Sequence, residues 1–165
     1  MNVHSAGILV YRTTPAGVEV LIVHPGGPFW AKKDTGAWSI TKGEFAASEN
    51  PQAAARREFQ EEVGAPAPPG ELTPLGESAQ KSGKIVHAFA VSGDFNLEYF
   101  KSNMFTMEWP PRSGVQQEFP ECDRAAWTPL QVAHQKLVPG QAVFIERLAQ
   151  HLGIEINPPS QTSLL

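Results

Sequence analysis

Cysteine is almost absent from this 165-residue sequence, which contains only Cys122. A disulfide needs two thiols, so none can form within the chain, and this composition fits a reducing compartment. The sequence also lacks a run of about 18 apolar residues and a basic leader followed by an apolar stretch, so it predicts neither a membrane span nor a signal peptide. We therefore expect a cytoplasmic protein without a membrane partner.

Positive charge is also scarce. The chain has 13 Lys and Arg against 17 Asp and Glu, which gives a formal net charge of −4. Proteins whose main task is to bind nucleic acid usually carry a basic excess. The composition therefore argues against a DNA-binding protein, and a nucleotide ligand would have to be bound by metal ions and a few local cations. It does not indicate an oligomeric state.

The length fits one domain with a sizeable core. We expect residues 1–156 to form this domain and residues 157–165, a short segment with proline and serine, to be a mobile tail. Short β-branched runs, turn residues and apolar stripes predict the order of the elements. They are strands at 4–12, 18–24 and 37–41, a hairpin within 71–92, a strand near 104–109, and helices near 129–135 and 141–152.

One further helix is predicted with sharp ends over residues 51–63. Asn50 is a candidate N-cap, Pro51 stands at the first helical position, and Gly64 stands where a left-handed residue commonly ends a helix. The adjoining flank of this helix is apolar and consists of Ala55, Phe59 and Val63.

Three carboxylates share a narrow face of that helix. At about 100° per residue, Glu58, Glu61 and Glu62 fall within about 100° of one another. Glu58 and Glu62 are like charges at i,i+4, which costs about 0.2–0.5 kcal/mol, and no lysine follows either of them four residues on. A merely solvated glutamate-rich face is the plain alternative. Converging carboxylates are better explained by a hard divalent cation, so we infer a Mg²⁺ or Mn²⁺ site.

The stretch around this helix resembles the complete Nudix box of the MutT-like hydrolases. The matching positions are Gly43, Glu49, Arg57, Glu58, Phe59, Glu61, Glu62, Gly64 and Ala65. The resemblance implies an α/β fold, the Nudix fold, in which a mixed β-sheet is sandwiched between helices. It implies metal ligation by Glu58, Glu61 and Glu62, with the Gly43 carbonyl as a further ligand. By the same resemblance, Glu49, Arg57 and Gly64 are structural residues of the box.

Nudix enzymes commonly add a glutamate from outside the box, as a metal ligand or general base. In the diadenosine tetraphosphate hydrolases this glutamate precedes a strand tryptophan by six residues, which selects Glu121 relative to Trp127 in this sequence. Glu118 is the second choice, and either residue is otherwise ordinary loop charge. The resemblance thus implies that Glu61, Glu62 and Glu121 form the catalytic set that deprotonates the attacking water.

Loop residues outside the box are the candidates for contacts with substrate. Lysines can bind phosphate oxygens and aromatic rings can stack on a base. Solvated lysines and aromatics that anchor a loop are the plain alternative. The candidates are Trp30, Lys32, Lys33, Lys42 and Arg112. The histidines His4, His24 and His87 are expected to be surface or satisfied core residues.

The function implied by the resemblance is Mg²⁺- or Mn²⁺-dependent cleavage of a pyrophosphate linkage in a nucleoside diphosphate joined to another group. The run from Ala6 to Arg12 and the late Trp127 are similar to the diadenosine polyphosphate hydrolase branch. Dinucleoside polyphosphates and nucleoside triphosphates are therefore the expected small-molecule substrates, and nucleotide sugars compete with them. The alternative is a catalytically silent Nudix-like module that senses a nucleotide or contacts a protein.

Overall fold

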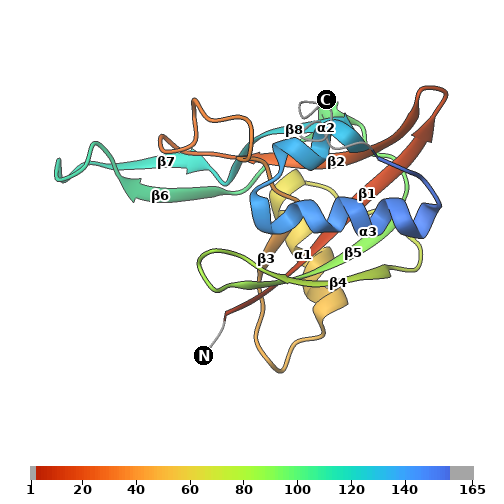
Figure 1. Ribbon diagram of the computed structural model, residues 1–165. Coiled ribbons are helices and arrows are strands. Elements are labelled where there is room, and N and C mark those ends of the chain that lie inside the picture. Colours follow the sequence, from red (N-terminus) through yellow and green to blue (C-terminus); the bar gives the residue numbers. More distant parts are fainter. Residues whose placement is uncertain (1–2, 157–165) are drawn as a thin grey trace.

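The first two strands form a hairpin, β1 (His4–Thr14) and β2 (Gly17–Pro25), as the sequence predicts. In the computed structural model, which describes residues 3–156, β1 lies inside a mixed six-stranded sheet (Figure 1). The sheet order is β4-β5-β1-β2-β8, and β3 also pairs with β1. Strand β5 (Ile85–Ser92) runs parallel to β1, whereas β4 (Thr73–Ala79) and β8 (Cys122–Pro129) are antiparallel to their neighbours.

Two strands pair with the same edge of β1, and the sheet splits where one replaces the other. The end of β1 pairs with β2 from Tyr11↔Val20 to Thr14↔Gly17, whereas its beginning pairs with β3 (Thr41–Glu44). Strand β2 therefore diverges from β1 and continues against β8. Gly43, the glycine that begins the box, lies in β3 and is therefore located at this split.

The predicted strand at 37–41 is wrong in its position. The continuous ladder with β1 starts at Thr41, and Trp38 and Ser39 make only isolated bridges, to Leu137 and Val23 respectively. These two residues have partners on different elements, Leu137 just after α2 and Val23 in β2. No single partner strand is available to them, so a regular ladder cannot form.

Helices cover both faces of the sheet, which confirms the predicted α/β/α arrangement. Helix α1 (Pro51–Val63) packs on one face, whereas α2 (Leu130–Lys136) and α3 (Ala142–Leu152) pack on the other. Side chains alternate along β1, so that Ile8 points to the α1 side and Leu9 to the α3 side. Two buried clusters result, one on each face of the sheet. The predicted terminal helices are both confirmed to within one residue at either end.

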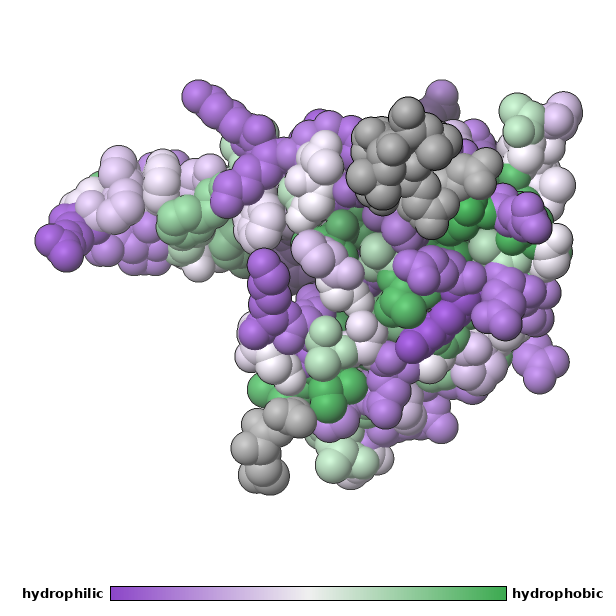
Figure 2. Space-filling model, in the orientation of Figure 1, coloured by the Kyte–Doolittle hydropathy of each residue, from purple (hydrophilic) through white to green (hydrophobic). Residues whose placement is uncertain are grey.

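A two-stranded ribbon projects from the sheet (Figures 1 and 2). It consists of β6 (Met104–Glu108) and β7 (Gln116–Pro120), which pair antiparallel. The strand predicted near residues 104–109 is confirmed, whereas β7 was missed because its sequence, Gln-Gln-Glu-Phe-Pro, is polar and has no buried face to produce an alternating pattern. Two short 3₁₀ helices, η1 (Leu97–Tyr99) and η2 (Pro139–Gln141), complete the elements.

The tail predicted at residues 157–165 lies outside the described residues. Within residues 3–156, no helix combines the length and the apolar character needed to cross a bilayer.

The N-cap of α1 generates a test of the fold. Asn50 Oδ1 accepts hydrogen bonds from the backbone N–H groups of Gln52 and Ala53, at 2.8 and 3.1 Å. Asn50→Ala removes this acceptor and should lower the free energy of unfolding by about 1 kcal/mol. Urea titration followed by circular dichroism measures the change as a lower midpoint at an unchanged slope. Asn50→Asp keeps the acceptor and is the control. Equal losses in both variants would contradict the capping role.

Candidate active site

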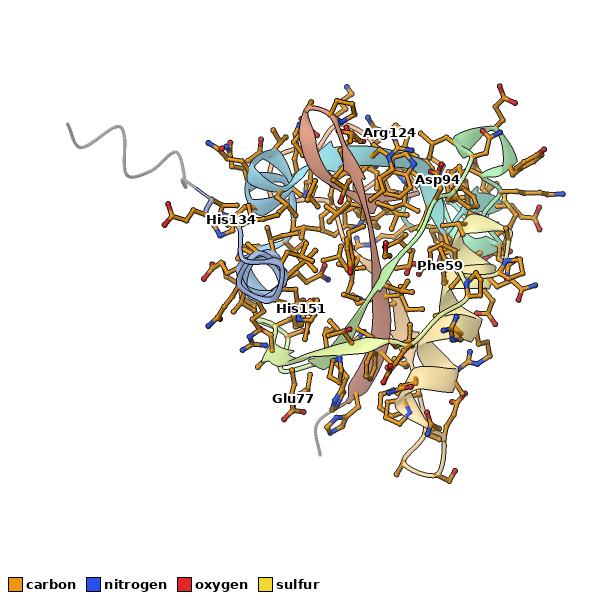
Figure 3. All side chains as sticks on the ribbon, turned by 90° about the vertical axis from the view of Figure 1, so that its right-hand side faces the viewer. Phe59, Glu77, Asp94, Arg124, His134 and His151 are labelled. Atoms are coloured by element: carbon orange, nitrogen blue, oxygen red, sulfur yellow. The ribbon has the colours of Figure 1, made fainter. Side chains whose placement is uncertain are left out.

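Helix α1 holds the glutamates, and both of its ends are defined as the sequence predicts. It is capped by Asn50 at the start and by Gly64 at the end, where Gly64 adopts a φ of +87° and donates its N–H to the carbonyl of Gln60 at 2.9 Å. Phe59 is only 1% exposed and points from α1 into the sheet (Figure 3). The predicted apolar flank is confirmed, because Ala55 and Val63 are fully buried beside Phe59. This packing fixes the rotation of the helix and therefore the direction of its carboxylates.

Glu58 lies directly over Gly43. A Cβ added to Gly43 would come within 2.0 Å of the Glu58 carboxyl group, so only glycine leaves room for this carboxylate. Glu58 is buried, and its Oε1 accepts a hydrogen bond of 2.7 Å from Arg57 Nη1. The first residue of the box and the first glutamate of the acidic face are thus in contact, although 15 positions separate them in the sequence.

Arg57 connects the glutamates to the loop that precedes the helix. Its guanidinium donates hydrogen bonds of 3.1–3.2 Å to both carboxylate oxygens of Glu49. The same group binds Glu58 and lies 3.6 Å from Glu61 Oε1. A planar guanidinium that bridges three carboxylates restricts their rotamers. This geometry accords with the structural role that the resemblance implies for Glu49 and Arg57.

Glu62 is held at the split of the sheet. Its Oε1 accepts a hydrogen bond of 3.2 Å from the backbone N–H of Lys42. Burial raises the pKa of Glu62 from its ordinary value of 4.5 to about 8, the charges of Glu58 and Glu121 add to this, and Lys42 acts in the opposite direction. Burial likewise lowers the pKa of the Lys42 ammonium. Both shifts favour the neutral forms, because desolvation outweighs the attraction between the two groups.

Cys122 packs beside Glu62 and is buried. Burial and the neighbouring Glu62 raise the pKa of its thiol. A thiol that stays protonated is a poor nucleophile, so Cys122 acts as a packing residue.

Glu121 joins the box glutamates from the junction between β7 and β8. Its backbone is fixed on both sides, since its N–H donates to the carbonyl of Asn103 at 2.8 Å and its carbonyl accepts from Gly26 at 2.9 Å. Glu121 and Glu62 line one cavity of about 130 Å³. The second choice, Glu118, instead faces Thr106 in the projecting ribbon. The structure therefore brings Glu121, and not Glu118, to the acidic face.

The crowded carboxylates are suited to a hard cation. Burial and the charge of Glu61 raise the pKa of both Glu58 and Glu121, while Arg57 partly offsets this at Glu58. The raised pKa values of Glu58, Glu62 and Glu121 show that these carboxylates are short of neighbouring positive charge, and together with Glu61 they form a set of oxygen donors. Mg²⁺ and Mn²⁺ prefer such donors. The donor set of Glu58, Glu61, Glu62 and Glu121 thus fits the metal that the sequence predicts.

A second cavity continues from the one beside Glu62. It measures about 290 Å³, and it shares Pro25, Ser39 and Lys42 with the smaller cavity. Trp30 forms part of its wall, and Lys33 Nζ lies 5.0 Å from the centre of the Trp30 ring. Two of the predicted substrate contacts, Trp30 and Lys42, are therefore brought to this cavity.

A third cavity lies on the other flank of the acidic face and measures about 490 Å³. Glu61 and Arg57 line it together with Lys101 and Asn103. The loop that carries Lys101 and Asn103 is fixed to the end of α1, since their N–H groups bind the carbonyls of Val63 and Glu61 at 2.9 and 3.0 Å. The sequence analysis missed both residues. In the sequence, the only indication of such a role was that a cationic residue and an amide residue stand in a segment without hydrophobic periodicity.

The remaining candidates, Lys32, Lys33 and Arg112, line none of these three cavities. Lys32 and Lys33 are exposed in the loop between β2 and β3, and the Lys33 carbonyl accepts a hydrogen bond of 2.7 Å from His24 Nε2. Arg112 is exposed in the turn between β6 and β7, at the end of the ribbon that points away from the sheet (Figure 1). The structure does not bring Arg112 to the glutamates.

The contact between Gly43 and Glu58 predicts a functional defect without unfolding. Gly43→Ala should displace the Glu58 carboxylate, which is the movable end of a side chain, and lower Mn²⁺ affinity tenfold or more at little cost in stability. Calorimetric Mn²⁺ titration and urea unfolding measure the two effects. Gly7→Ala is the contrast, because its Cβ would meet the Thr41 carbonyl oxygen at 2.3 Å, and it should cost about 1–3 kcal/mol of stability. Undiminished Mn²⁺ affinity in Gly43→Ala would refute the prediction.

The raised pKa of Glu62 predicts how stability depends on pH. The folded protein holds this proton more tightly than the unfolded chain does, so the stabilisation is complete below about pH 4.5 and is lost as the pH rises through about 8. In the presence of chelator, the melting temperature should decrease as the pH rises from about 4.5 to about 8. In the Glu62→Gln variant, the melting temperature should depend less on pH. Scanning calorimetry at several pH values measures both. If the melting temperature of Glu62→Gln decreased equally steeply with pH, other groups would be responsible for the pH dependence.

Comparisons with known proteins identify the family of this chain. The family model described as NUDIX domain matches residues 1–148. No curated protein shows significant sequence similarity to the chain.

Solved structures share the fold at low sequence identity. An Ap4A hydrolase from C. elegans, crystallised as a binary complex, has a TM-score of 0.60 at 18% identity, over 90% of this chain and 98% of that one. The NUDIX domain of NrtR from Shewanella oneidensis, complexed with ADP ribose, has a TM-score of 0.60 at 13% identity, over 92% and 89%. A MutT protein from Methanosarcina mazei Go1 has a TM-score of 0.56 at 18% identity, over 92% and 95%. With a complete box and a family match over nearly its whole length, the chain belongs to the Nudix family.

Proposed function

We propose that this protein uses Mg²⁺ or Mn²⁺ to hydrolyse a nucleoside triphosphate or a dinucleoside polyphosphate at a pyrophosphate linkage. The observation that carries the proposal is the gathering of Glu58, Glu61, Glu62 and Glu121 between two larger cavities. A linkage cleaved at these carboxylates would extend into a cavity on either side. That arrangement suits a substrate with a nucleoside on one side of the phosphates and a second group on the other.

Glu58, Glu61 and Glu62, with Glu121 and the Gly43 carbonyl, would hold the divalent cation. When bound, the cation would neutralise phosphate charge and lower the pKa of a coordinated water. Arg57 and Glu49 keep the carboxylates in position, so little reorganisation is needed on binding. Such a site binds the anionic phosphates even though the chain carries a net charge of −4.

Proton transfer from the attacking water falls to the carboxylates of this set. Glu62 and Glu121 line the same cavity, and the pKa of each is raised by burial. A carboxylate with a pKa closer to the working pH is a stronger base than an ordinary surface glutamate. We therefore assign the proton acceptor to a carboxylate oxygen of Glu62 or Glu121, while Glu61, which is 39% exposed, completes the set.

Recognition of the nucleoside is assigned to the cavity with Trp30. An aromatic wall stacks on any base, and Lys42 at the junction of the two smaller cavities adds a donor for phosphate. The phosphates or second group would then lie in the larger cavity, near Lys101 and Asn103. The Ap4A hydrolase and the domain complexed with ADP ribose among the solved structures support a nucleotide of this kind.

A substrate panel tests the proposal. The purified protein is incubated with nucleoside triphosphates, dinucleoside polyphosphates and nucleotide sugars, in Mg²⁺, in Mn²⁺ and in chelator, and the products are identified by mass. We expect cation-dependent cleavage of the triphosphates or the dinucleoside polyphosphates. Nucleotide binding without any cleavage would support the catalytically silent module instead.

The glutamate assignments are tested with conservative variants. Glu62→Gln and Glu121→Gln keep the shape of the side chain but remove the anion, and kcat should fall about 100-fold or more in at least one of them. Glu118→Gln is the matched control, because it changes a neighbouring glutamate that faces Thr106 in the ribbon, and its kcat should stay unchanged. Full turnover in both Glu62→Gln and Glu121→Gln would remove these residues from the proton-transfer step.

A further inference from the structure

A second cluster of metal-ligating side chains lies outside the Nudix box. It consists of His4, Glu77 and His87, which come from three adjacent strands, β1, β4 and β5. Glu77 stands directly opposite His87 in the antiparallel β4–β5 pair. None of the three lines the cavities described above. Figure 3 shows Glu77 projecting from β4 at the edge of the sheet.

Two ring nitrogens of this cluster are close enough to share one ion, and Glu77 lies behind one of the rings. His4 Nδ1 lies 2.8 Å from His87 Nε2, and His87 Nδ1 lies 3.4 Å from Glu77 Oε2. Each residue offers one ligand atom, and these atoms all lie within 4.8 Å of one another. The His87 side chain is 24% exposed and that of Glu77 is 60% exposed, so an ion can reach the cluster from solvent.

The two imidazole nitrogens that face each other, His4 Nδ1 and His87 Nε2, lie at hydrogen-bonding distance. In the absence of an ion, a hydrogen bond can form only if one nitrogen carries a proton and the other presents its lone pair. A cation between them satisfies both lone pairs at once. Zn²⁺ binds imidazole nitrogen at about 2.0–2.1 Å, which places two such nitrogens about 3.3 Å apart in tetrahedral geometry. His4 is the first residue of β1, where a shift of about half an ångström is easily accommodated.

The surroundings hold the rings in place. Phe45 packs edge-on against both imidazoles, with ring centroids 6.3 Å from His4 and 5.6 Å from His87. Strand pairing fixes the three backbones relative to one another. A site built on paired strands is more precise than one built on loops. His87 was expected to be a satisfied core histidine. Both of its nitrogens do face partners, but its side chain is half-buried and accessible to solvent and does not lie in the core.

We propose that His4, Glu77 and His87 form a binding site for a borderline divalent cation of the zinc class, separate from the carboxylate site of the box. His4 Nδ1 and His87 Nε2 are the ligands. In the metal-bound site, Glu77 Oε2, which lies 3.4 Å from His87 Nδ1, would accept the Nδ1–H of His87 and keep that ring in the tautomer whose Nε2 lone pair faces the ion. Water completes the coordination. Imidazole ligands favour Zn²⁺ over Mg²⁺, whereas the all-oxygen box favours the hard ions, so the two sites take different metals.

The cation would stabilise the folded protein near Phe45, where the chain leaves β3 and leads to α1. It would link β1, β4 and β5 at the point where the His4 carbonyl accepts a hydrogen bond of 3.1 Å from Phe45 N–H. Phe45 begins the loop that leads from β3 to Asn50 and into α1. An ion that binds only the folded state raises the melting temperature, and the increase grows with the logarithm of the ion concentration once that exceeds Kd.

The decisive experiment titrates Zn²⁺ into metal-free protein in excess Mg²⁺, which occupies the carboxylates, and follows the ring nitrogens of all five histidines by long-range ¹H–¹⁵N NMR. We expect the resonances of His4 and His87 to shift at micromolar Zn²⁺, while those of His24, His134 and His151 stay in place. No shift at His4 and His87, or shifts at other histidines alone, would overturn the proposal. This measurement uses the unaltered chain and so does not depend on how a variant folds.

Variants give an independent test. His4→Ala and His87→Ala should lose Zn²⁺ binding in competition with a chromophoric chelator, and Glu77→Gln should weaken it tenfold or more. The control is His134→Ala, because His134 also pairs with a carboxylate, Glu146 at 2.9 Å, and it should bind Zn²⁺ as the unaltered chain does. Zn²⁺ should raise the melting temperature of the control but not of His4→Ala or His87→Ala. Unchanged affinity in both of these histidine variants would refute the site.

Discussion

The candidate active site depends on the burial of like charges at one corner of the sheet. Glu62 is desolvated and lies near Glu58 and Glu121, and its pKa rises to about 8 as a result. Nothing in folding favours such an arrangement by itself, because buried carboxylates without a cation oppose ionisation. It is held by the rest of the molecule. Phe59 docks α1 on the sheet, and Arg57 ties the helix to Glu49 in the loop before it. Burying like-charged carboxylates beside a cavity is unfavourable, and other contacts in the molecule offset this free energy. Such an arrangement is typical of a functional site.

The split of the sheet brings the two halves of the site together. Strand β3 takes over the edge of β1 that β2 leaves, so Gly43 lies under Glu58 while Lys42 meets Glu62. The diverging strands also leave space between them. This space forms the two adjoining cavities, both of which are lined by Pro25, Ser39 and Lys42. The same strand pairing places the second cluster of ligands at the beginning of β1. One sheet thus carries an oxygen-rich site and, by our proposal, a nitrogen-rich site at different positions, and ligand chemistry distinguishes the ions that each would take.

Elements with a local cause were predictable. The bounds of α1 follow from Asn50 and Gly64, whose cap contacts involve only residues within four positions, and the first hairpin follows from two β-branched runs around a turn. The failures have the opposite character. The expected strand at 37–41 broke up because Trp38 and Ser39 have partners on different elements, and β7 was missed because its exposed polar residues carry no pattern. Lys101 and Asn103 reach the site through backbone hydrogen bonds with α1 and, for Asn103, with Glu121, and no local signal encodes these contacts.

The sequence by itself determined the acidic helix and its resemblance to the Nudix box, since these depend on periodicity and on fixed spacing within about 23 residues. The resemblance in turn implied the α/β/α fold class. It also pointed to Glu121, although only by comparison of spacing. The tertiary structure decided which distant residues stand beside that helix: Glu121 and not Glu118, Trp30 and Lys42 but not Arg112, and His4 beside His87. The physical reason is that register and strand order between distant segments depend on the packing of the whole sheet, whereas helix caps and helix faces depend on neighbours in the chain.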